Sequence, residues 1–248
     1  MIFAKAAQPE KIDYSGYPHK NVVVAGATGL VGREIIRVLR ERPNATVFAL
    51  IRKGSSLGDL GGCAKEIEFD YDSPGHYERI GGDIPCDALL CALGTTIKKA
   101  GSPEAFRLVD LEYPTNLIAR LQQLPNKPMF GLVSSVGAGK PKGLYLRTKS
   151  EAEKRLIDSG LPHLIARPSL LLGKREEFRQ GEFAAKLILV PYQAVISAFA
   201  PQSGLLWRYA PIEAAKVAEA MARICVDEPP LEQSKILEGL ALHHPILI

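Results

Sequence analysis

Two side chains in the middle of the chain have the chemistry of proton transfer. Tyr145 and Lys149 are four residues apart in the segment YLRTK, so on a helix both would lie on one face. A free phenol, with a pKa of about 10, is a poor acid or base at neutral pH, but a nearby ammonium group favours the phenolate. The spacing therefore predicts a tyrosine that exchanges a proton with a bound molecule and a lysine that assists it.

Two hydroxyl groups, Ser134 and Ser135, precede this segment, at the end of an apolar run over residues 128–134. A hydroxyl at the end of a buried strand can hold a reacting oxygen or stabilise the charge that develops on it. The residues alone leave open which of the two serines has this role.

A glycine pattern near the beginning of the chain indicates a phosphate-containing ligand. The sequence VVVAGATGLVG, residues 22–32, places GxxGxxG between an apolar run and a helical pattern. Such glycines permit a tight turn, the approach of backbone amides to a pyrophosphate, and close packing of helix on strand. The positive end of the helix dipole then faces the phosphates. We therefore expect a dinucleotide to be bound by Gly26, Thr28, Gly29, Leu30, Val31 and Gly32.

The residues after the second apolar run favour one dinucleotide over the other. Sites for NAD usually have an acidic residue there that binds the ribose hydroxyls, whereas this chain has Arg52 and Lys53. A guanidinium group can bind the 2′-phosphate of NADP in a charge-assisted pair. We therefore expect NADP(H) rather than NAD(H), with Arg52 and Lys53 as binding residues.

Two further segments are expected along the same ligand. Asp70 ends the third apolar run and could accept a hydrogen bond from the adenine amino group, and Tyr71 could line that pocket, but either could equally be a surface turn residue. Ala92, Leu93 and Gly94 follow the fourth run, and their small size would let the adenosine ribose pass close to the backbone.

The elements that must position these residues alternate along the chain. Apolar runs predict strands at 21–25, 46–51, 66–70, 87–93, 128–134 and 163–166, with a candidate late strand at 235–240. Helical patterns occupy 33–42, 103–123, 144–159 and 212–225. Near-continuous apolar strands that alternate with helices are typical of a parallel sheet covered on both faces. The sequence therefore predicts a doubly wound α/β domain.

Two regions do not fit this alternation. Residues 1–20 are polar and turn-rich, and we interpret them as an arm before a single domain of residues 21–248. Residues 169–210 carry few periodic signals. We expect this segment to form a small substrate or lid region in the C-terminal part.

Composition excludes several classes of protein. The chain has 248 residues, 46% of them hydrophobic, and a net charge of +4, which excludes wholesale disorder and does not by itself indicate nucleic acid. No stretch reaches ~18 uncharged apolar residues, so no membrane span is expected. The four cysteines form no CxxC pair, and His243 and His244 lack partners at metal spacing, so we expect no disulfide framework and no metal site. A cytoplasmic location is expected.

Several motifs together resemble the short-chain dehydrogenase/reductase superfamily, in its atypical, extended-like branch: GATGLVG, VSSVGA, YLRTK and ARPSLLLG. Within this branch, three longer segments are similar to the Tat-interacting oxidoreductase group: CALGTTIKKAGSPEAF, LYLRTKSEAEK and ARPSLLLGKREEFRQGE. The resemblance covers about residues 20–225.

The resemblance implies a Rossmann fold that binds NADPH. It also implies that Tyr145 is the general acid/base, that Lys149 lowers the pKa of Tyr145, and that Ser135 is the active hydroxyl, with Ser134 as its neighbour. We also expect Lys149 to hydrogen-bond the nicotinamide ribose and Ser134 to bind the cofactor. The turn at Pro168 and Ser169 resembles the segment that passes the nicotinamide carboxamide.

The leading interpretation is an NADP-dependent oxidoreductase that acts on a carbonyl through a Ser-Tyr-Lys set. Only ten positions separate Ser135 from Tyr145, which is shorter than is usual in the superfamily. One alternative is an NADPH-binding regulator, without turnover, that controls a protein partner. Another is an epimerase or dehydratase that acts on a nucleotide-linked substrate.

Overall fold

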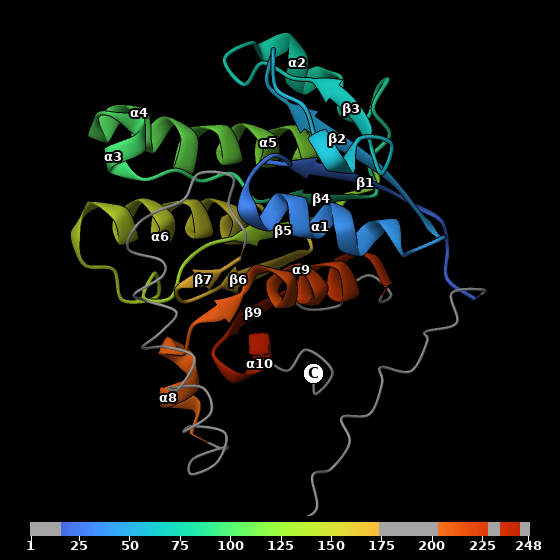
Figure 1. Cartoon of the computed structure of the whole chain (residues 1–248). Coiled ribbons are helices and arrows are strands. Elements are labelled where there is room, and N and C mark those ends of the chain that lie inside the picture. Colours follow the sequence, from blue (N-terminus) through green and yellow to red (C-terminus); the bar gives the residue numbers. More distant parts are fainter. Residues whose placement is uncertain (1–15, 174–202, 228–233, 244–248) are drawn as a thin grey trace, which may run out of the picture.

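The centre of the molecule is a seven-stranded parallel sheet (Figure 1). The computed structural model describes residues 16–173, 203–227 and 234–243. The strands follow the order β3-β2-β1-β4-β5-β6-β9. Their bounds are β1 (Lys20–Ala25), β2 (Ala45–Ile51), β3 (Lys65–Glu68), β4 (Ala88–Cys91), β5 (Met129–Val133), β6 (His163–Arg167) and β9 (Lys235–Glu238).

The strands are apolar because both faces of the sheet are covered. Along β1, Val22 and Val24 belong to one hydrophobic core and Val23 and Ala25 to the other, as the two-residue period of a strand requires. All four side chains are fully buried. A continuous apolar run is therefore the sequence signature of a central strand here.

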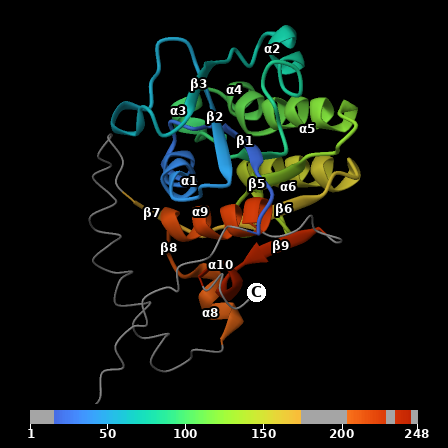
Figure 2. The same ribbon diagram turned by 90° about the vertical axis from the view of Figure 1, so that its right-hand side faces the viewer.

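Helices cover both faces of this sheet, and Figure 2 shows α1 and α9 on one side of the strands and α5 and α6 on the other. The helices are α1 (Leu30–Arg40), α2 (Pro74–Glu78), α3 (Ile97–Ala100), α4 (Pro103–Arg107), α5 (Tyr113–Gln123), α6 (Gly143–Asp158), α8 (Gly204–Tyr209), α9 (Ala214–Ala222) and α10 (Leu240–His243). A 3₁₀ turn, η1 (Gly58–Leu60), and two π-helical turns, η2 (Leu108–Glu112) and η3 (Arg223–Asp227), complete the helical elements of the described residues.

The strand order reverses between β1 and β4. The chain proceeds from β1 to β2 and β3 in one direction, and from β4 to β5, β6 and β9 in the other. In open parallel sheets, the crevice at the carboxyl ends of the strands beside such a reversal is the usual ligand site. The topology therefore predicts a ligand site formed by the loops after β1, β4 and β5.

The predicted doubly wound parallel sheet is confirmed, and the local differences have physical causes. The helix expected over 103–123 is divided by the π turn η2. The helix expected over 212–225 begins two residues later, because β8 (Ile212–Glu213) pairs with β7 (Leu171–Leu172) in a small second sheet. Most of the expected arm and of the expected lid lie outside the described residues. No helix in the described ranges is both long and apolar enough to cross a membrane.

Candidate functional site

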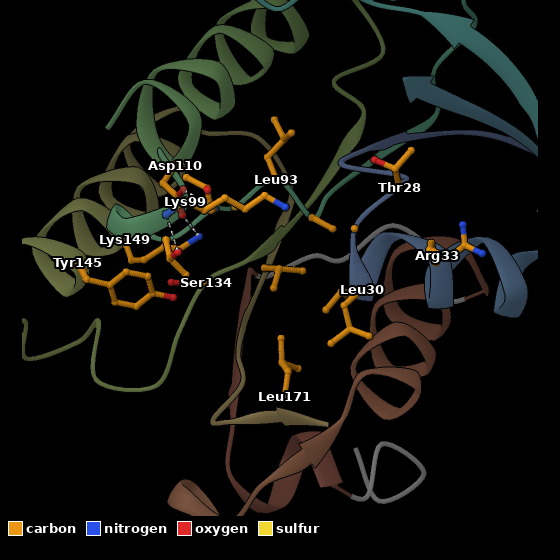
Figure 3. Close-up of a pocket in the computed structure, with 17 residues that line it drawn as sticks. Thr28, Leu30, Arg33, Leu93, Lys99, Asp110, Ser134, Tyr145, Lys149 and Leu171 are labelled. Atoms are coloured by element: carbon orange, nitrogen blue, oxygen red, sulfur yellow. Dashed lines mark hydrogen bonds and ion pairs between the residues drawn. The ribbon is translucent and has the colours of Figure 1, made fainter. Parts of the chain in front are cut away.

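A cavity of about 400 Å³ opens at the carboxyl edge of the sheet, at the strand reversal (Figure 3). Its walls come from the glycine loop and α1, from the loop after β4, from the end of β5 and from α6. Ten of the expected site residues line it: Thr28, Gly29, Leu30, Val31, Ala92, Leu93, Gly94, Ser134, Tyr145 and Lys149.

The glycine loop has the close packing that its spacing predicts. Gly26 has a φ of 77°, a conformation that glycine adopts without strain, and a Cβ atom there would lie 2.6 Å from the Ala92 carbonyl. A Cβ atom on Gly32 would collide with the Gly26 carbonyl. The loop is thus held against β4, and the N-terminal turn of α1, whose amides have no helical acceptor, faces the cavity.

Tyr145 and Lys149 lie in the first half of α6 and share one face, as expected. The Tyr145 ring stacks on Phe106 of α4, with ring centroids 5.6 Å apart. Tyr145 remains 36% exposed, whereas Lys149 is buried. The phenol is therefore exposed to solvent, while the ammonium group lies in a buried part of the cavity wall.

Sequence reasoning missed the partner of this lysine. Lys149 Nζ forms an ion pair with Asp110 Oδ1 at 2.8 Å, and both side chains are almost fully buried. The other carboxylate oxygen accepts a hydrogen bond from the Thr95 amide at 2.8 Å. Asp110 lies in η2, and π turns inside helices occur frequently at functional sites. An acidic residue on the apolar face that includes Phe106 and Leu117 is the sequence signal that could have revealed it.

The ion pair keeps Lys149 cationic. Burial alone would lower the pKa of Lys149, but the charges of Asp110 and Tyr145 and the hydrogen bond to Asp110 outweigh burial and raise it. A Cβ atom on Gly94 would lie 3.5 Å from both Asp110 Oδ1 and Lys149 Nζ. The glycine at that position therefore leaves the ion pair open to the cavity.

The two serines differ in their surroundings. Ser134 lines the cavity, and its hydroxyl donates a hydrogen bond to Glu153 of α6. Ser135 is half-buried, is not part of the cavity wall, and makes a long hydrogen bond of 3.4 Å to the Val136 carbonyl. The structure therefore brings Ser134, and not Ser135, together with Tyr145 and Lys149.

Of the residues expected on the adenosine side, those after β4 line this cavity, whereas those after β2 and β3 lie outside its wall. Arg52, Lys53 and Asp70 are all exposed, and an Asp70 carboxylate oxygen accepts a hydrogen bond from the Asp72 amide. Tyr71 is buried and stacks on Tyr113 with centroids 5.1 Å apart. Burial is the main cause that raises the pKa of Tyr71, and the neighbouring Arg52 opposes it.

Other residues of the wall were not expected from the sequence. Arg33 of α1 lines the cavity while its guanidinium binds Asp59 and, at 2.9 Å, the Leu57 carbonyl. Lys99 of α3 also contributes to the wall, and Leu171 of β7 closes the opposite side. Basic residues therefore stand on two sides of the cavity.

The residues Pro168 and Ser169 are not part of the cavity wall. The Pro168 carbonyl accepts a hydrogen bond from the Val136 amide at 2.9 Å, and the Ser169 hydroxyl donates to the Ala210 carbonyl. The turn thus fixes the end of β6 against the segment after β5 and against the residue that follows α8.

The residues present fit a bound dinucleotide. The close backbone packing at Gly26 and Gly32 holds the loop in place. The open amides of α1 and the buried cation at Lys149 provide the contacts that phosphates and ribose hydroxyls require. Within the described ranges, no group of three or more His, Cys, Asp or Glu residues could hold a metal ion.

Comparison with known proteins assigns the chain to a family. The model of a family described as NAD(P)H-binding matches residues 26–186. A mitochondrial protein of Candida albicans, FMP52, is 35% identical over 160 residues, which cover 62% of this chain and 68% of that protein. The HTATIP2 protein of Rattus norvegicus is 30% identical over 174 residues, which cover 68% and 69%. The expected resemblance to the Tat-interacting group is confirmed.

Solved structures share the fold at low identity. A UDP-Glc/GlcNAc 4-epimerase from Campylobacter jejuni has a TM-score of 0.66 at 16% identity and covers 90% of this chain and 79% of its own. A protein described as a putative epimerase from Burkholderia cenocepacia has a TM-score of 0.65 at 17% identity, with 94% and 81% covered. These similarities confirm the Rossmann fold.

The expected cytoplasmic location is contradicted by these comparisons. FMP52 proteins of several fungi carry the description mitochondrial in their names. The expectation relied on composition and on the cysteine pattern, which report a reducing environment and not a particular compartment.

Proposed function

Because this chain belongs to the NAD(P)H-binding family, among the atypical short-chain dehydrogenases/reductases, we propose that it is an NADP-dependent oxidoreductase that reduces a carbonyl group. The observation that carries the proposal is that the glycine loop, Tyr145 and Lys149 line one and the same cavity. The mitochondrial names of the fungal relatives support a mitochondrial site of action.

The choice of NADP rests on charge. Arg52 and Lys53 follow β2 with exposed side chains, and no acidic residue stands at that strand end. A 2′-phosphate needs cationic donors there, whereas free ribose hydroxyls are usually held by a carboxylate. These two residues therefore support NADP(H) over NAD(H).

The proposed roles follow from position and charge. Bound NADPH supplies a hydride to the carbonyl carbon. Tyr145 Oη donates a proton to the carbonyl oxygen from the exposed side of α6. Lys149 stays cationic through Asp110, so it can bind ribose hydroxyls and replace the proton that Tyr145 gives up.

Calorimetric titration tests the cofactor first. We expect NADPH to bind at least about tenfold more tightly than NADH, since a charge-assisted pair contributes ~1.5–3 kcal/mol, and Arg52→Ala to remove this preference. Arg155→Ala, an exposed arginine on α6, is the matched control and should preserve it. Failure of the wild-type protein to bind either dinucleotide would refute the proposal.

Turnover is tested with Tyr145→Phe. The ring keeps its stacking on Phe106 and loses only the hydroxyl. Removal of a general acid typically costs ~10²–10⁴-fold in rate, so NADPH consumption with a panel of aldehydes and ketones should fall at least about 100-fold while NADPH affinity stays within about twofold. An equal rate in the variant would exclude Tyr145 as the proton donor.

One observation favours a second candidate function, a protein that binds NADPH without turnover and controls a partner. Ser135 is not part of the cavity wall and the Ser134 proton is bonded to Glu153, so of the expected serine–tyrosine pair Tyr145 is the member that can donate to a substrate oxygen. Tight NADPH binding, no turnover on the panel, and a partner whose affinity changes with NADPH would support this candidate.

A further inference from the structure

The hydroxyl of Ser134 belongs to a buried hydrogen-bonded group. It donates to Glu153, and Glu153 is held by two hydrogen bonds from Arg167 of β6, from Nε to Oε1 at 2.9 Å and from Nη2 to Oε2 at 2.6 Å. Ser134 and Glu153 are 5% and 3% exposed. The group therefore has little access to water other than through the cavity.

Donor and acceptor roles in this group can be assigned from chemistry alone. An arginine can only donate and a carboxylate can only accept, and two parallel bonds between them are a strong, charge-assisted pair. The hydrogen bond to Glu153 is the main cause that raises the pKa of Arg167, which agrees with a charged pair. Since Glu153 cannot donate, the proton between it and Ser134 must be the one on the serine oxygen.

This assignment determines what Ser134 can do in the cavity. Its single proton is directed at Glu153, so its oxygen presents only lone pairs to a ligand. We propose that Ser134 is a cofactor-binding residue that accepts a hydrogen bond from the carboxamide N–H of the nicotinamide, and that Glu153 is the positioning residue that makes it an acceptor. This inference rests on the proposed function.

The carboxamide is the ligand group that fits. A carbonyl oxygen undergoing reduction needs donors and would be repelled by an oxygen that offers only lone pairs. The nicotinamide ring must lie near Tyr145 for hydride and proton to reach one carbonyl group, and Ser134 lines the same cavity as Tyr145. The carboxamide N–H is the hydrogen-bond donor that the nicotinamide ring brings close to Ser134.

The test uses a dinucleotide that lacks only this donor. In 3-acetylpyridine adenine dinucleotide phosphate, a methyl ketone replaces the carboxamide, so the carbonyl is kept and the N–H groups are lost. The ratio of its dissociation constant to that of NADP⁺ is measured by calorimetry for the wild-type protein, Ser134→Ala and the matched control Ser135→Ala. Ser134→Ala leaves both bonds from Arg167 to Glu153 in place, so folding should be preserved.

A hydrogen bond between neutral groups contributes roughly a three- to tenfold change in affinity. We therefore expect the ratio to fall by that factor in Ser134→Ala and to stay at the wild-type value in Ser135→Ala. Glu153→Gln, whose amide can donate to Ser134 and free its proton, should also lower the ratio, an effect that a purely structural role of Glu153 would not produce.

Two results would overturn the inference. A ratio in Ser134→Ala equal to that of the wild-type protein would mean that Ser134 donates to the carbonyl, which both dinucleotides carry, or does not contact the ring. A lower ratio in Ser135→Ala, with no change in Ser134→Ala, would mean that Ser135 and not Ser134 accepts the hydrogen bond from the carboxamide. In both cases the wild-type protein still binds NADP⁺, whereas failure of the proposed function would appear as no binding of either dinucleotide and would remove the inference with it.

Discussion

The Asp110–Lys149 ion pair allows a quantitative prediction for Asp110→Asn. The two side chains are 0% and 6% exposed and 2.8 Å apart. The asparagine can still accept from the Thr95 amide, but its NH₂ group then faces the Lys149 ammonium, donor against donor. Removal of one partner of a buried ion pair typically costs ~3–5 kcal/mol. In a chain of this size about 1 kcal/mol corresponds to roughly 2–4 °C in Tm, so we expect a Tm lower by roughly 6–20 °C.

The matched control is Glu151→Gln. Glu151 pairs with Arg107 at 3.0 Å, a similar distance, but both side chains are more than one third exposed. Surface pairs of this kind contribute less than about 1 kcal/mol. Thermal and urea unfolding of the two variants and the wild-type protein, at one salt concentration, therefore isolates the effect of burial.

The pH dependence gives a second, independent readout. In the wild-type protein the pKa of Lys149 is raised above its ordinary value of 10.5, so its contribution to stability is fully present below pH 10.5 and is lost only as pH rises through the higher folded value. In Asp110→Asn, the carboxylate charge that opposed the effect of burial is gone, so burial lowers the pKa of Lys149. The folded variant then binds fewer protons at this site than the unfolded chain, and its stability rises with pH.

The deficit of Asp110→Asn relative to the wild-type protein should therefore shrink between pH 7 and pH 10. A deficit no larger than that of Glu151→Gln would refute the conclusion that this buried pair supports the site. A deficit that stays constant over this pH range would refute the assignment of the lost energy to the lysine charge.

Further predictions concern the glycine loop and the thiols. Gly32→Ala should abolish NADPH binding in calorimetry, because a Cβ atom there collides with the Gly26 carbonyl. The control Gly75→Ala, where a Cβ atom meets open space, should bind NADPH as the wild-type protein does. Equal NADPH affinities of the two variants would contradict the predicted clash. Burial raises the pKa of Cys91 to about 11 and of Cys86 to about 12, so at pH 8 a thiol reagent followed by mass spectrometry should label the half-buried Cys63 well before either of them. Early labelling of Cys86 or Cys91 in the native protein would show that β4 and the segment before it open.

The sequence was sufficient for features that depend on local spacing. The strand–glycine–helix unit was predictable because Gly26 and Gly32 act within one turn of chain, and Tyr145 and Lys149 share a face because a helix repeats every 3.6 residues. The parallel sheet followed from continuous apolar runs, since both of its faces are buried.

The features that were missed depend on contacts between segments that are distant in the sequence, or on which of two successive residues faces the cavity. Asp110 meets Lys149 only because a π turn interrupts a helix that periodicity describes as continuous. Glu153 looked like one of several charges on α6, and its partner Arg167 comes from the adjacent strand. Ser134 and Ser135 follow the same strand end, and successive side chains of an extended chain point to opposite sides, so no composition argument could choose between them.

The π turn at Leu108–Glu112 also has a consequence for how this chain could change in length. A π turn closes its hydrogen bonds between residues i and i+5, one residue more than an α turn. Loss of a single residue there would let α4 and α5 join as one regular helix, with Leu117 and Leu121 still in the core. The widened turn that brings Asp110 to Lys149 would disappear. We therefore expect the fold to tolerate the deletion of one residue in η2, whereas the candidate site would lose the ion pair between Asp110 and Lys149.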